Sequence, residues 1–476
     1  MDAERRIAEL EAELAAREAR IAELEARVVE QDARIAEFTK QVAELLERLG
    51  LSSRNSSKPP SSDAPSARAE RRAKGKSQRK RGGQPGHRGS RRTLLPPEQV
   101  DEFVHLYPSD CENCWAALPQ TPDAHAQRYQ SAELPVFKPR ITEHCVHSVV
   151  CPDCEHRTWG PYEKVPISPF GPRLSSVVAL LTGVYHLSRR ATVDVMRDVL
   201  GVQISLGAVS AVEGRVSEAV KPAFDEAWEQ ARGACVKHTD GTSWFKAGLM
   251  CSLWTAATTM VTAFKIVANG KKETLVALFG ELRGILVSDR ATALKFWAME
   301  HRQICWAHLL RKFVSFSERA ATAGELGREL LDYCGILFAY WNDFQAGTLS
   351  RAGLHAAMAP LRTQVENTLQ RAAAANIDTV SGSCIDILEH KAALWTFVEH
   401  EGVEPTNNHA ERELRAFVLW RKRSFGTQSD RGNLFAERLM TVAHTARKQN
   451  KNVLTFLTQC CTAARDSTAP PSLLSP

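Results

Sequence analysis

The chain lacks the features that mark membrane and secreted proteins. No apolar run in its 476 residues approaches the ~20 residues of a membrane span, and the N-terminus is charged at once. We therefore expect neither a transmembrane helix nor a signal peptide. The 12 cysteines include two Cys-x-x-Cys pairs and are otherwise scattered, which argues against a disulfide framework and favours a reducing compartment and metal binding. At 43% hydrophobic residues, the chain can bury the cores of two to four domains.

A large excess of one charge is also missing, since the net charge is only +6, but the charges are unevenly placed. Residues 1–49 carry 13 acids against 8 bases, residues 54–92 carry 13 bases against 2 acids, and residues 412–451 carry 10 bases against 3 acids. The two basic blocks predict a polyanionic partner, most often nucleic acid. A solvated tail and a solvated helix face would also explain them.

Residues 1–49 contain a heptad repeat. The a positions are Ile7, Leu14, Ile21, Val28, Ile35, Val42 and Leu49, and the d positions are Leu10, Leu24, Phe38 and Leu45, with Arg17 and Gln31 as exceptions. This pattern predicts a coiled coil that forms a homodimer or a higher assembly, because an apolar repeat of 3.5 residues keeps one seam facing a partner helix. A long helix packed on its own chain is the alternative.

Residues 50–97 change to proline, glycine, serine and positive charge without apolar periodicity. Such a segment cannot build a core, so we expect a flexible basic linker that lies along DNA phosphates. The side chains expected to contact DNA here are Arg79, Lys80, Arg81, His87, Arg88 and Arg91. A free linker without a ligand is the alternative.

Residues 98–165 are predicted to form a zinc-ribbon-like module. Cys111 and Cys114 form one knuckle, and Cys151 and Cys154 form a second one 36 residues later. Four thiolates make a closed tetrahedral site, which indicates structural rather than catalytic zinc. Three rival ligands lie between the pairs: His144, Cys145 and His147. Reduced turns without metal are the alternative.

Residues 166–230 are predicted to be helical, with helices over Leu174–Leu187 and Arg190–Leu200 and a third that begins at a Ser205 cap. Two helices joined by a short turn with Gly201 have the outline of a helix-turn-helix DNA-binding unit, although plain helix bundles also contain such pairs.

Residues 231–313 alternate between strand and helix patterns. A strand over 235–240 ends on Asp240, and strands over 249–260 and 261–267 follow. A helix over 271–282, a strand over 284–288 that ends before Asp289, a helix over 291–300 and a strand over 303–306 complete the order. This order predicts an α/β RNase H-like catalytic core in a multidomain, mostly α protein. Its first and fourth strands would be neighbours and would bring Asp240 and Asp289 together, as a two-metal site requires.

The remaining residues are assigned to three further segments. Residues 314–400 are read as a helical insertion, 401–456 as the second part of the core, and 457–476 as a C-terminal tail. Glu411 lies in the first turn of a predicted helix over 408–419, capped by Thr406 or Asn407. Taken alone, each of the three acids is weak evidence, because an acid at a strand end is usually a solvated turn residue.

Several separated motifs resemble those of the insertion-sequence-66 family of DDE transposases. They include 55–63 (NSSKPPSSD), 82–87 (GGQPGH), 240–244 (DGTSW), 288–290 (SDR), 305–313 (CWAHLLRKF), 405–412 (PTNNHAER) and 424–428 (SFGTQ). The resemblance covers nearly the whole chain and implies a catalytic triad of Asp240, Asp289 and Glu411 that holds Mg²⁺ or Mn²⁺. Family members often have Asp-Glu-Thr where this chain has Asp240-Gly241-Thr242, so any role of that glutamate is absent here.

The resemblance also implies partners: transposon ends and target DNA, and accessory proteins encoded by the same element. We expect His308 and Arg311 to help position a phosphate, although His308 could simply pack. Phosphate clamps are expected at Arg412, Arg415, Arg421, Lys422 and Arg423. A bacterial, nucleoid-associated cytoplasmic protein is the expected setting.

The implied reaction is hydrolysis at the element's end followed by attack of the freed 3′-hydroxyl on target DNA. Two other classes remain open at this point. One is a non-catalytic, zinc-containing DNA-binding protein or repressor derived from a transposase. The other is a plain nuclease of the same fold, which would cut DNA and never join it.

Overall fold

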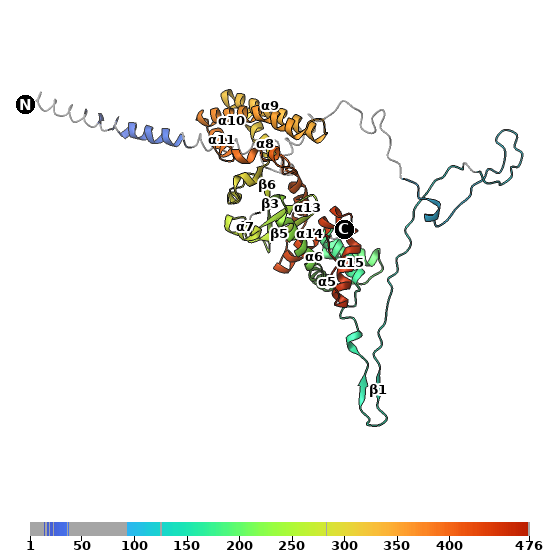
Figure 1. Cartoon of the computed structure of the whole chain (residues 1–476). Helices are drawn as coiled ribbons and strands as arrows, with labels where there is room; N and C mark the ends of the chain where they lie inside the picture. Colours follow the sequence, from blue (N-terminus) through green and yellow to red (C-terminus); the bar gives the residue numbers. More distant parts are fainter. Residues whose placement is uncertain are drawn as a thin grey trace, which may run out of the picture.

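The computed structural model describes residues 14, 17–18, 20–21, 23–35, 37, 93–123, 126–281 and 283–474. A β-sheet lies in the middle of the molecule between two groups of helices, and a long arm extends away from them (Figure 1). None of the described helices is both long and apolar enough to span a bilayer.

The central sheet has five strands in the order β5-β4-β3-β6-β7. Their bounds are β3 Val236–Lys246, β4 Leu249–Ala257, β5 Thr262–Val267, β6 Ile285–Ser288 and β7 Arg302–Ile304. β3, β4 and β5 are antiparallel neighbours, whereas β6 pairs in parallel with both β3 and β7. The predicted adjacency of the first and fourth strands is confirmed, and the mixed sheet agrees with the expected α/β core.

Two predicted boundaries in this core are wrong. β3 continues past Asp240 to Lys246, because β4 pairs with it along that whole length. The predicted helix over 291–300 is two short 3-10 turns, η5 Thr292–Leu294 and η6 Met299–His301, which place Leu294 and Trp297 in the core. The helix between β5 and β6 is present as α7 Lys272–Phe279.

Different helices cover the two faces of the sheet. α13 (Asn408–Ser424) packs on the face that carries Trp244, Leu253 and Phe264. On the other face, α6 (Lys221–Gly233) packs against Trp254 and the alanines of β4 and β5. The sheet is therefore buried on both sides, which explains the nearly continuous apolar run of β4.

The helices beside the sheet join the N-terminal and C-terminal parts of the chain in one core. They are α3 Pro172–Ala179, α4 Arg189–Asp198, α5 Leu206–Ala219, α14 Asp430–Lys448 and α15 Val453–Asp466. The predicted first helix changes to the π-helical turn η4 Leu180–Val184, and the predicted cap is confirmed, since Ser205 Oγ accepts from Ala208 N at 3.2 Å. The expected tail after residue 457 is wrong: α15 continues through that point, and Leu473 is fully buried.

The helix-turn-helix reading remains a prediction. α4 and α5 have the expected lengths and turn, but α5 gives Val209, Val212 and Val216 to the core. Its exposed face carries Arg215.

Side chains of α14 close one edge of the sheet. The N–H groups of Thr262, Phe264 and Ile266 on the edge strand β5 donate to Thr445, Thr441 and Glu437, which are spaced four residues apart on α14. Unpaired backbone groups at an edge invite pairing with another chain, and this helix satisfies them.

The predicted insertion is helical and has its own core. Its helices are α8 Trp306–Ser317, α9 Ala321–Gln345, α10 Arg351–Ala374, α11 Val380–Glu389 and α12 Thr396–Glu399, with the short turn η7 Lys391–Leu394. This core also includes Ile285 and Val287 of β6 and Ile304 of β7, so the insertion packs directly on the strand that precedes Asp289.

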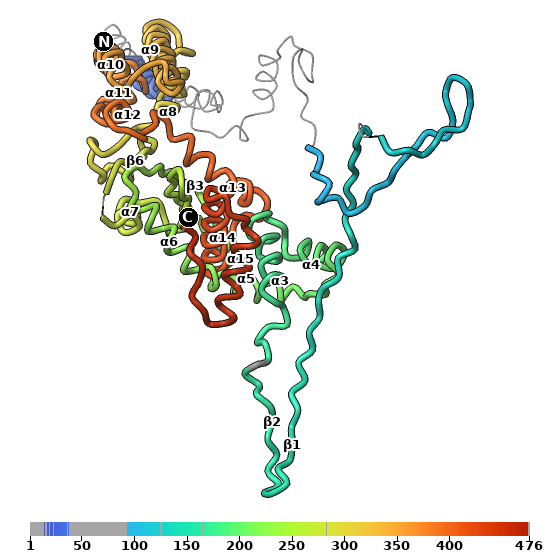
Figure 2. Tube along the Cα trace, turned by 45° about the vertical axis from the view of Figure 1, so that its right-hand side comes forward, coloured from blue at the N-terminus to red at the C-terminus, as the bar shows by residue number. Residues whose placement is uncertain are grey.

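The N-terminal part of the chain contains little regular structure among its described residues. The arm, residues 93–171, carries the turns η2 Pro97–Gln99 and η3 Tyr162–Lys164 and a hairpin of β1 Ser148–Val150 and β2 Arg157–Trp159 (Figure 2). The predicted linker over 50–97 lies outside the described residues except for 93–97.

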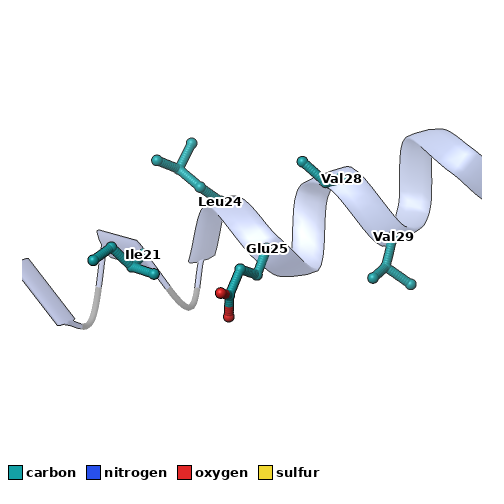
Figure 3. Close-up of a pocket in the computed structure, with 5 residues that line it drawn as sticks. All are labelled: Ile21, Leu24, Glu25, Val28 and Val29. Atoms are coloured by element: carbon teal, nitrogen blue, oxygen red, sulfur yellow. The ribbon is translucent and has the colours of Figure 1, made fainter.

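Residues 23–35 form a helix whose apolar side chains are exposed (Figure 3). Leu24 and Val28, at predicted seam positions, expose 44% and 54% of their surface. An exposed apolar seam agrees with a face that needs a partner helix, and dimerisation remains a prediction.

Candidate catalytic site

The register of two parallel strands sets Asp240 and Asp289 level with each other. His238 opposite Val287 is the last paired position of β3 and β6, and each acid lies two residues beyond it. Neighbouring strands are separated by about 4.8 Å, so two residues at the same level start close together. Past this point the next pairing of β3 on that side is the bridge between Lys246 and Thr427, so among the described residues no strand covers this edge of β3 beside the two carboxylates.

Local hydrogen bonds fix both acids. Asp240 Oδ1 accepts from the Gly241 N–H at 2.8 Å, and Asp289 Oδ1 accepts from the Ala291 N–H at 3.0 Å. Behind them, the fully buried Arg302 donates to Ser288 Oγ and to the Asp289 carbonyl, at 2.9 and 3.0 Å. This arginine fixes the turn that presents Asp289.

Glu411 reaches the same site from α13. Even-numbered residues of β3 face this helix: His238 lies 5.1 Å from His409, and Trp244 lies 5.4 Å from Phe417, between ring centroids. Asp240 has the same parity, so it faces the first turn of α13, where Glu411 lies. Burial, together with the charges of Asp289 and Glu411, raises the pKa of Asp240 to about 7.

Asn407 joins the elements that carry the acids. Its Nδ2 donates to the Thr239 carbonyl at 2.7 Å, and its Oδ1 lies 3.2 Å from His238 Nδ1. Its backbone N–H donates to Cys305 Sγ, and its carbonyl accepts from the Glu411 N–H. The predicted capping role of this side chain is wrong: Asn407 has the cap position, but its side chain binds β3 instead.

A second buried polar group supports α13 from behind. Glu413 binds His444 at 2.5 Å and Lys448 at 3.1 Å, and Lys448 also contacts His409 at 2.7 Å. Although burial opposes the charge, these partners lower the pKa of Glu413 to about 2. The sequence pattern gives no sign of this group, because its α13 half (His409 and Glu413) and its α14 half (His444 and Lys448) are 31 residues apart from Glu413 to His444.

His308 and Arg311 lie beside Glu411, and their predicted role in positioning a phosphate remains a prediction. His308 Nδ1 and Arg311 Nη2 are each 3.5 Å from Glu411 Oε1. With Cys305, His308 and Glu411 form the one group of three metal-binding side chains within 4.8 Å among the described residues. Burial raises the pKa of the Cys305 thiol to about 11, so this thiol is protonated at neutral pH.

A cavity of about 360 Å³ opens beside the two aspartates. Its lining includes Asp240, Gly241, Trp254, Asn269 and Asp289. A Cβ at residue 241 would lie 2.8 Å from the Trp254 ring, so any side chain larger than glycine at this position would require that ring to move.

The predicted phosphate clamps fall into three groups. Arg412, Arg415, Lys422 and Arg423 are exposed on α13. Arg421 is different, because its guanidinium binds Ser243 and Thr242 along the open edge of β3, so it fastens α13 to the sheet. The six predicted DNA contacts between residues 79 and 91 lie outside the described residues.

The two cysteine knuckles have the same turn geometry. In each, the carbonyl of the first cysteine accepts from the fourth residue on, Trp115 or Glu155, which has a positive φ near 58°. Backbone N–H groups inside each turn lower the pKa of the first thiol, Cys111 or Cys151. The structure does not gather the four thiols: within the described residues they form no common cluster, and the segment of the first knuckle lies far from the β1–β2 hairpin (Figure 2).

Three carboxylates at the open edge of a mixed sheet, approached by a helix, form a candidate site for divalent cations. The family model for the IS66 family of transposases matches residues 168–434, more than half of the chain, and the chain belongs to this family. Family membership supports a transposase role and implies DNA binding. Residues 2–93 match a second family, DUF6444, whose function is unknown. Comparison with curated proteins finds no match.

Proposed function

We propose that this chain is a DDE transposase with an RNase H-like core, in which Asp240, Asp289 and Glu411 are the catalytic residues. The observation that carries the proposal is the register of β3 and β6, which sets two aspartates level where the strands separate, under the first turn of α13. Family membership alone would not select these three acids from the 55 Asp and Glu residues of the chain.

The donor atoms fit Mg²⁺ or Mn²⁺. All three candidate ligands are carboxylates, and hard oxygen ligands are those that these cations prefer. Bound cations would activate a nucleophile and neutralise charge on a reacting phosphate. Asn407 would fix the segments that carry Asp240 and Glu411, Arg302 would fix the turn that presents Asp289, and Arg311 would orient the Glu411 side chain.

The proposed reaction has two phosphoryl transfers. Water attacks a phosphodiester at the element's end and the P–O bond to the neighbouring nucleotide breaks, which leaves a free 3′-hydroxyl. That hydroxyl then attacks a target phosphodiester, forms a new P–O bond and releases the target's own 3′-hydroxyl. Arg412 and Arg415, exposed one and four residues after Glu411, would bind flanking phosphates.

The test is strand transfer in vitro with end DNA from the element, a target plasmid and Mg²⁺. We expect joined products that disappear in EDTA and in Asp289→Asn, and that persist in Asp225→Asn, a matched change on the surface of α6. Cleavage without joining would favour a nuclease. End binding without either reaction would favour a repressor derived from a transposase.

We further propose that the two knuckles, which lie far apart in this structure, come together to bind one structural zinc ion through Cys111, Cys114, Cys151 and Cys154. The support is the shared knuckle geometry, which leaves both thiols of each pair free to act as ligands. Purified protein should contain one zinc per chain, and a Cys111→Ser/Cys151→Ser double variant should contain none. Equal zinc contents would refute the assignment.

The helix over residues 23–35 is proposed to dimerise. Its support is the exposed seam of Leu24 and Val28 (Figure 3). Light scattering should show at least a dimer for the full chain and a smaller species for Val28→Asp, because a buried charge in a coiled-coil seam is costly. Glu25→Lys, a charge change outside the predicted seam, is the control.

A further inference from the structure

A basic stripe on α13 leads away from the catalytic acids and ends at an exposed phenylalanine. The exposed residues of this helix after Glu411 are Arg412, Arg415, Leu419, Lys422, Arg423 and Ser424, and Phe425 follows directly. The stripe contains four cations and no acid. Glu413 is turned inward, and Asp430, the next acid along the chain, is paired with Lys246 at 2.7 Å.

Phe425 exposes 78% of its surface, although its backbone is fixed. Its N–H donates to the Arg421 carbonyl at 2.8 Å, and Thr427 N donates to the Phe245 carbonyl at 2.9 Å. A Cβ at the next residue, Gly426, would lie 2.1 Å from that same carbonyl, so the loop sits directly on the end of β3. The ring therefore projects from a rigid support.

The backbone of Phe425 is also unfavourable for its residue type. Its φ is +56° at the C-terminal end of α13, a position where glycine or asparagine is usual. A bulky residue in this region carries strain, and such strain is common where a side chain has a function. Neither core packing nor helix capping explains a phenylalanine here.

We propose that Phe425 stacks against an unpaired base of the DNA end, while the basic stripe of α13 binds the phosphates between that base and the catalytic acids. The inference rests on the proposed function and adds a base-binding site to it. Aromatic rings beside a positively charged track are the usual means of holding single-stranded nucleic acid, because every base has a face that can stack.

The helix length gives the position of this base. Fourteen residues separate Glu411 from Phe425, which corresponds to about 21 Å along α13. At about 3.4 Å per nucleotide, the base would lie about six nucleotides from the scissile phosphate.

The experiment uses the full chain and end duplexes with 2-aminopurine placed singly at positions two to ten from the scissile phosphate, in EDTA so that no cleavage occurs. We expect a rise in fluorescence near position six with the wild type and with Phe425→Tyr. Phe425→Ala should lose the rise. Leu419→Ala, which removes another exposed apolar side chain of the same stripe, should keep it.

A second readout excludes a purely structural role. Phe425→Ala should reduce end binding by roughly 5- to 150-fold, and a mismatch at the responsive position should restore most of that loss by removing the need to unpair the base. If the wild type binds end DNA and no position depends on Phe425, the inference is overturned while the proposed function stands. If the wild type does not bind end DNA at all, both are overturned.

Discussion

Replacing Asn407 should uncouple DNA binding from chemistry. Asn407→Ala removes the donor to the Thr239 carbonyl and the partner of His238 Nδ1, both in a fully buried region. Leaving a buried polar group without its partner costs ~1–3 kcal/mol, so two such losses predict about 2–6 kcal/mol of local destabilisation. The first turn of α13 would then be held to β3 less firmly.

The catalytic effect should exceed the effect on stability. Asp240 follows Thr239 directly, and the Glu411 N–H donates to the Asn407 carbonyl, so the lost contact lies between two candidate catalytic acids. A displacement of about 1 Å in a catalytic group can cost ~10²-fold in rate. Since Asn407 is fully buried and cannot touch DNA, end binding should be unchanged.

The assay compares strand-transfer rate, end-DNA affinity and melting temperature for the wild type and three variants. Asn408→Ala is the matched control, because the neighbouring asparagine is exposed and should behave as wild type. Asn407→Asp keeps the shape of the side chain but loses the Nδ2 donor, so its strand-transfer rate should decrease as much as that of Asn407→Ala. A folded Asn407→Ala protein with strand transfer within twofold of Asn408→Ala would refute the reasoning, as would a parallel loss of DNA affinity.

Three further predictions concern the core. Burial raises the pKa of Glu437 to about 7, so the ionisation of this side chain disfavours the folded state, and the free energy of unfolding should fall as pH rises from about 4.5 to about 7 and stay level above that. Glu437→Gln should therefore raise the free energy of unfolding at pH 8 by up to about 3 kcal/mol, seen as a higher melting temperature, and should have no such effect at pH 4. Thr441→Val should cost ~1–3 kcal/mol in a denaturant titration, because it removes the acceptor for an edge-strand N–H, whereas Thr441→Ser should cost less; equal losses would contradict this. Gly241→Ala should lower strand transfer at least about 10-fold without loss of fold, since its Cβ would press on Trp254 beside Asp240, and unchanged rates would show that the ring moves freely.

The sequence was sufficient to predict the order of the strands in the core and the adjacency of the two strands that carry Asp240 and Asp289. The apolar runs over 249–267 and the short run over 285–288 predict the strands, and the parallel pairing of β3 with β6 follows from that order. The end of β3 was not predictable in the same way. Asp240-Gly241 has the composition of a turn, and only the pairing with β4 extends the strand beyond it.

The support around the acids could not be predicted from local pattern. Asn407 reads as a helix cap from its neighbours, but the groups that it binds lie 168 and 102 residues away, on β3 and before α8. The sequence around Arg421 likewise predicts a phosphate clamp, but the Arg421 guanidinium points toward the sheet and binds Ser243 at the open edge of β3. Residues of this kind are defined by contacts across the fold, which periodicity and spacing do not contain.

The helical insertion closes the second edge of the sheet, as α14 closes the first. On β7, the Gln303 side chain donates to the Leu394 carbonyl at 3.1 Å and accepts from the Phe397 N–H at 2.8 Å, both in the last part of the insertion. Asp386 of the insertion also pairs with Arg290, the residue after Asp289. These contacts fasten the insertion to the turn that carries a candidate catalytic acid.

The insertion is therefore part of the site's support rather than an appendage to the core. β7 has only three residues, and a strand of this length gains little from its own pairing, so the covering helices are needed to keep it in the sheet. β7 in turn carries Arg302, whose guanidinium holds the Asp289 carbonyl. The position of Asp289 thus depends on a chain of contacts that begins in the insertion, which explains how so large a segment can lie between two candidate catalytic acids without separating them.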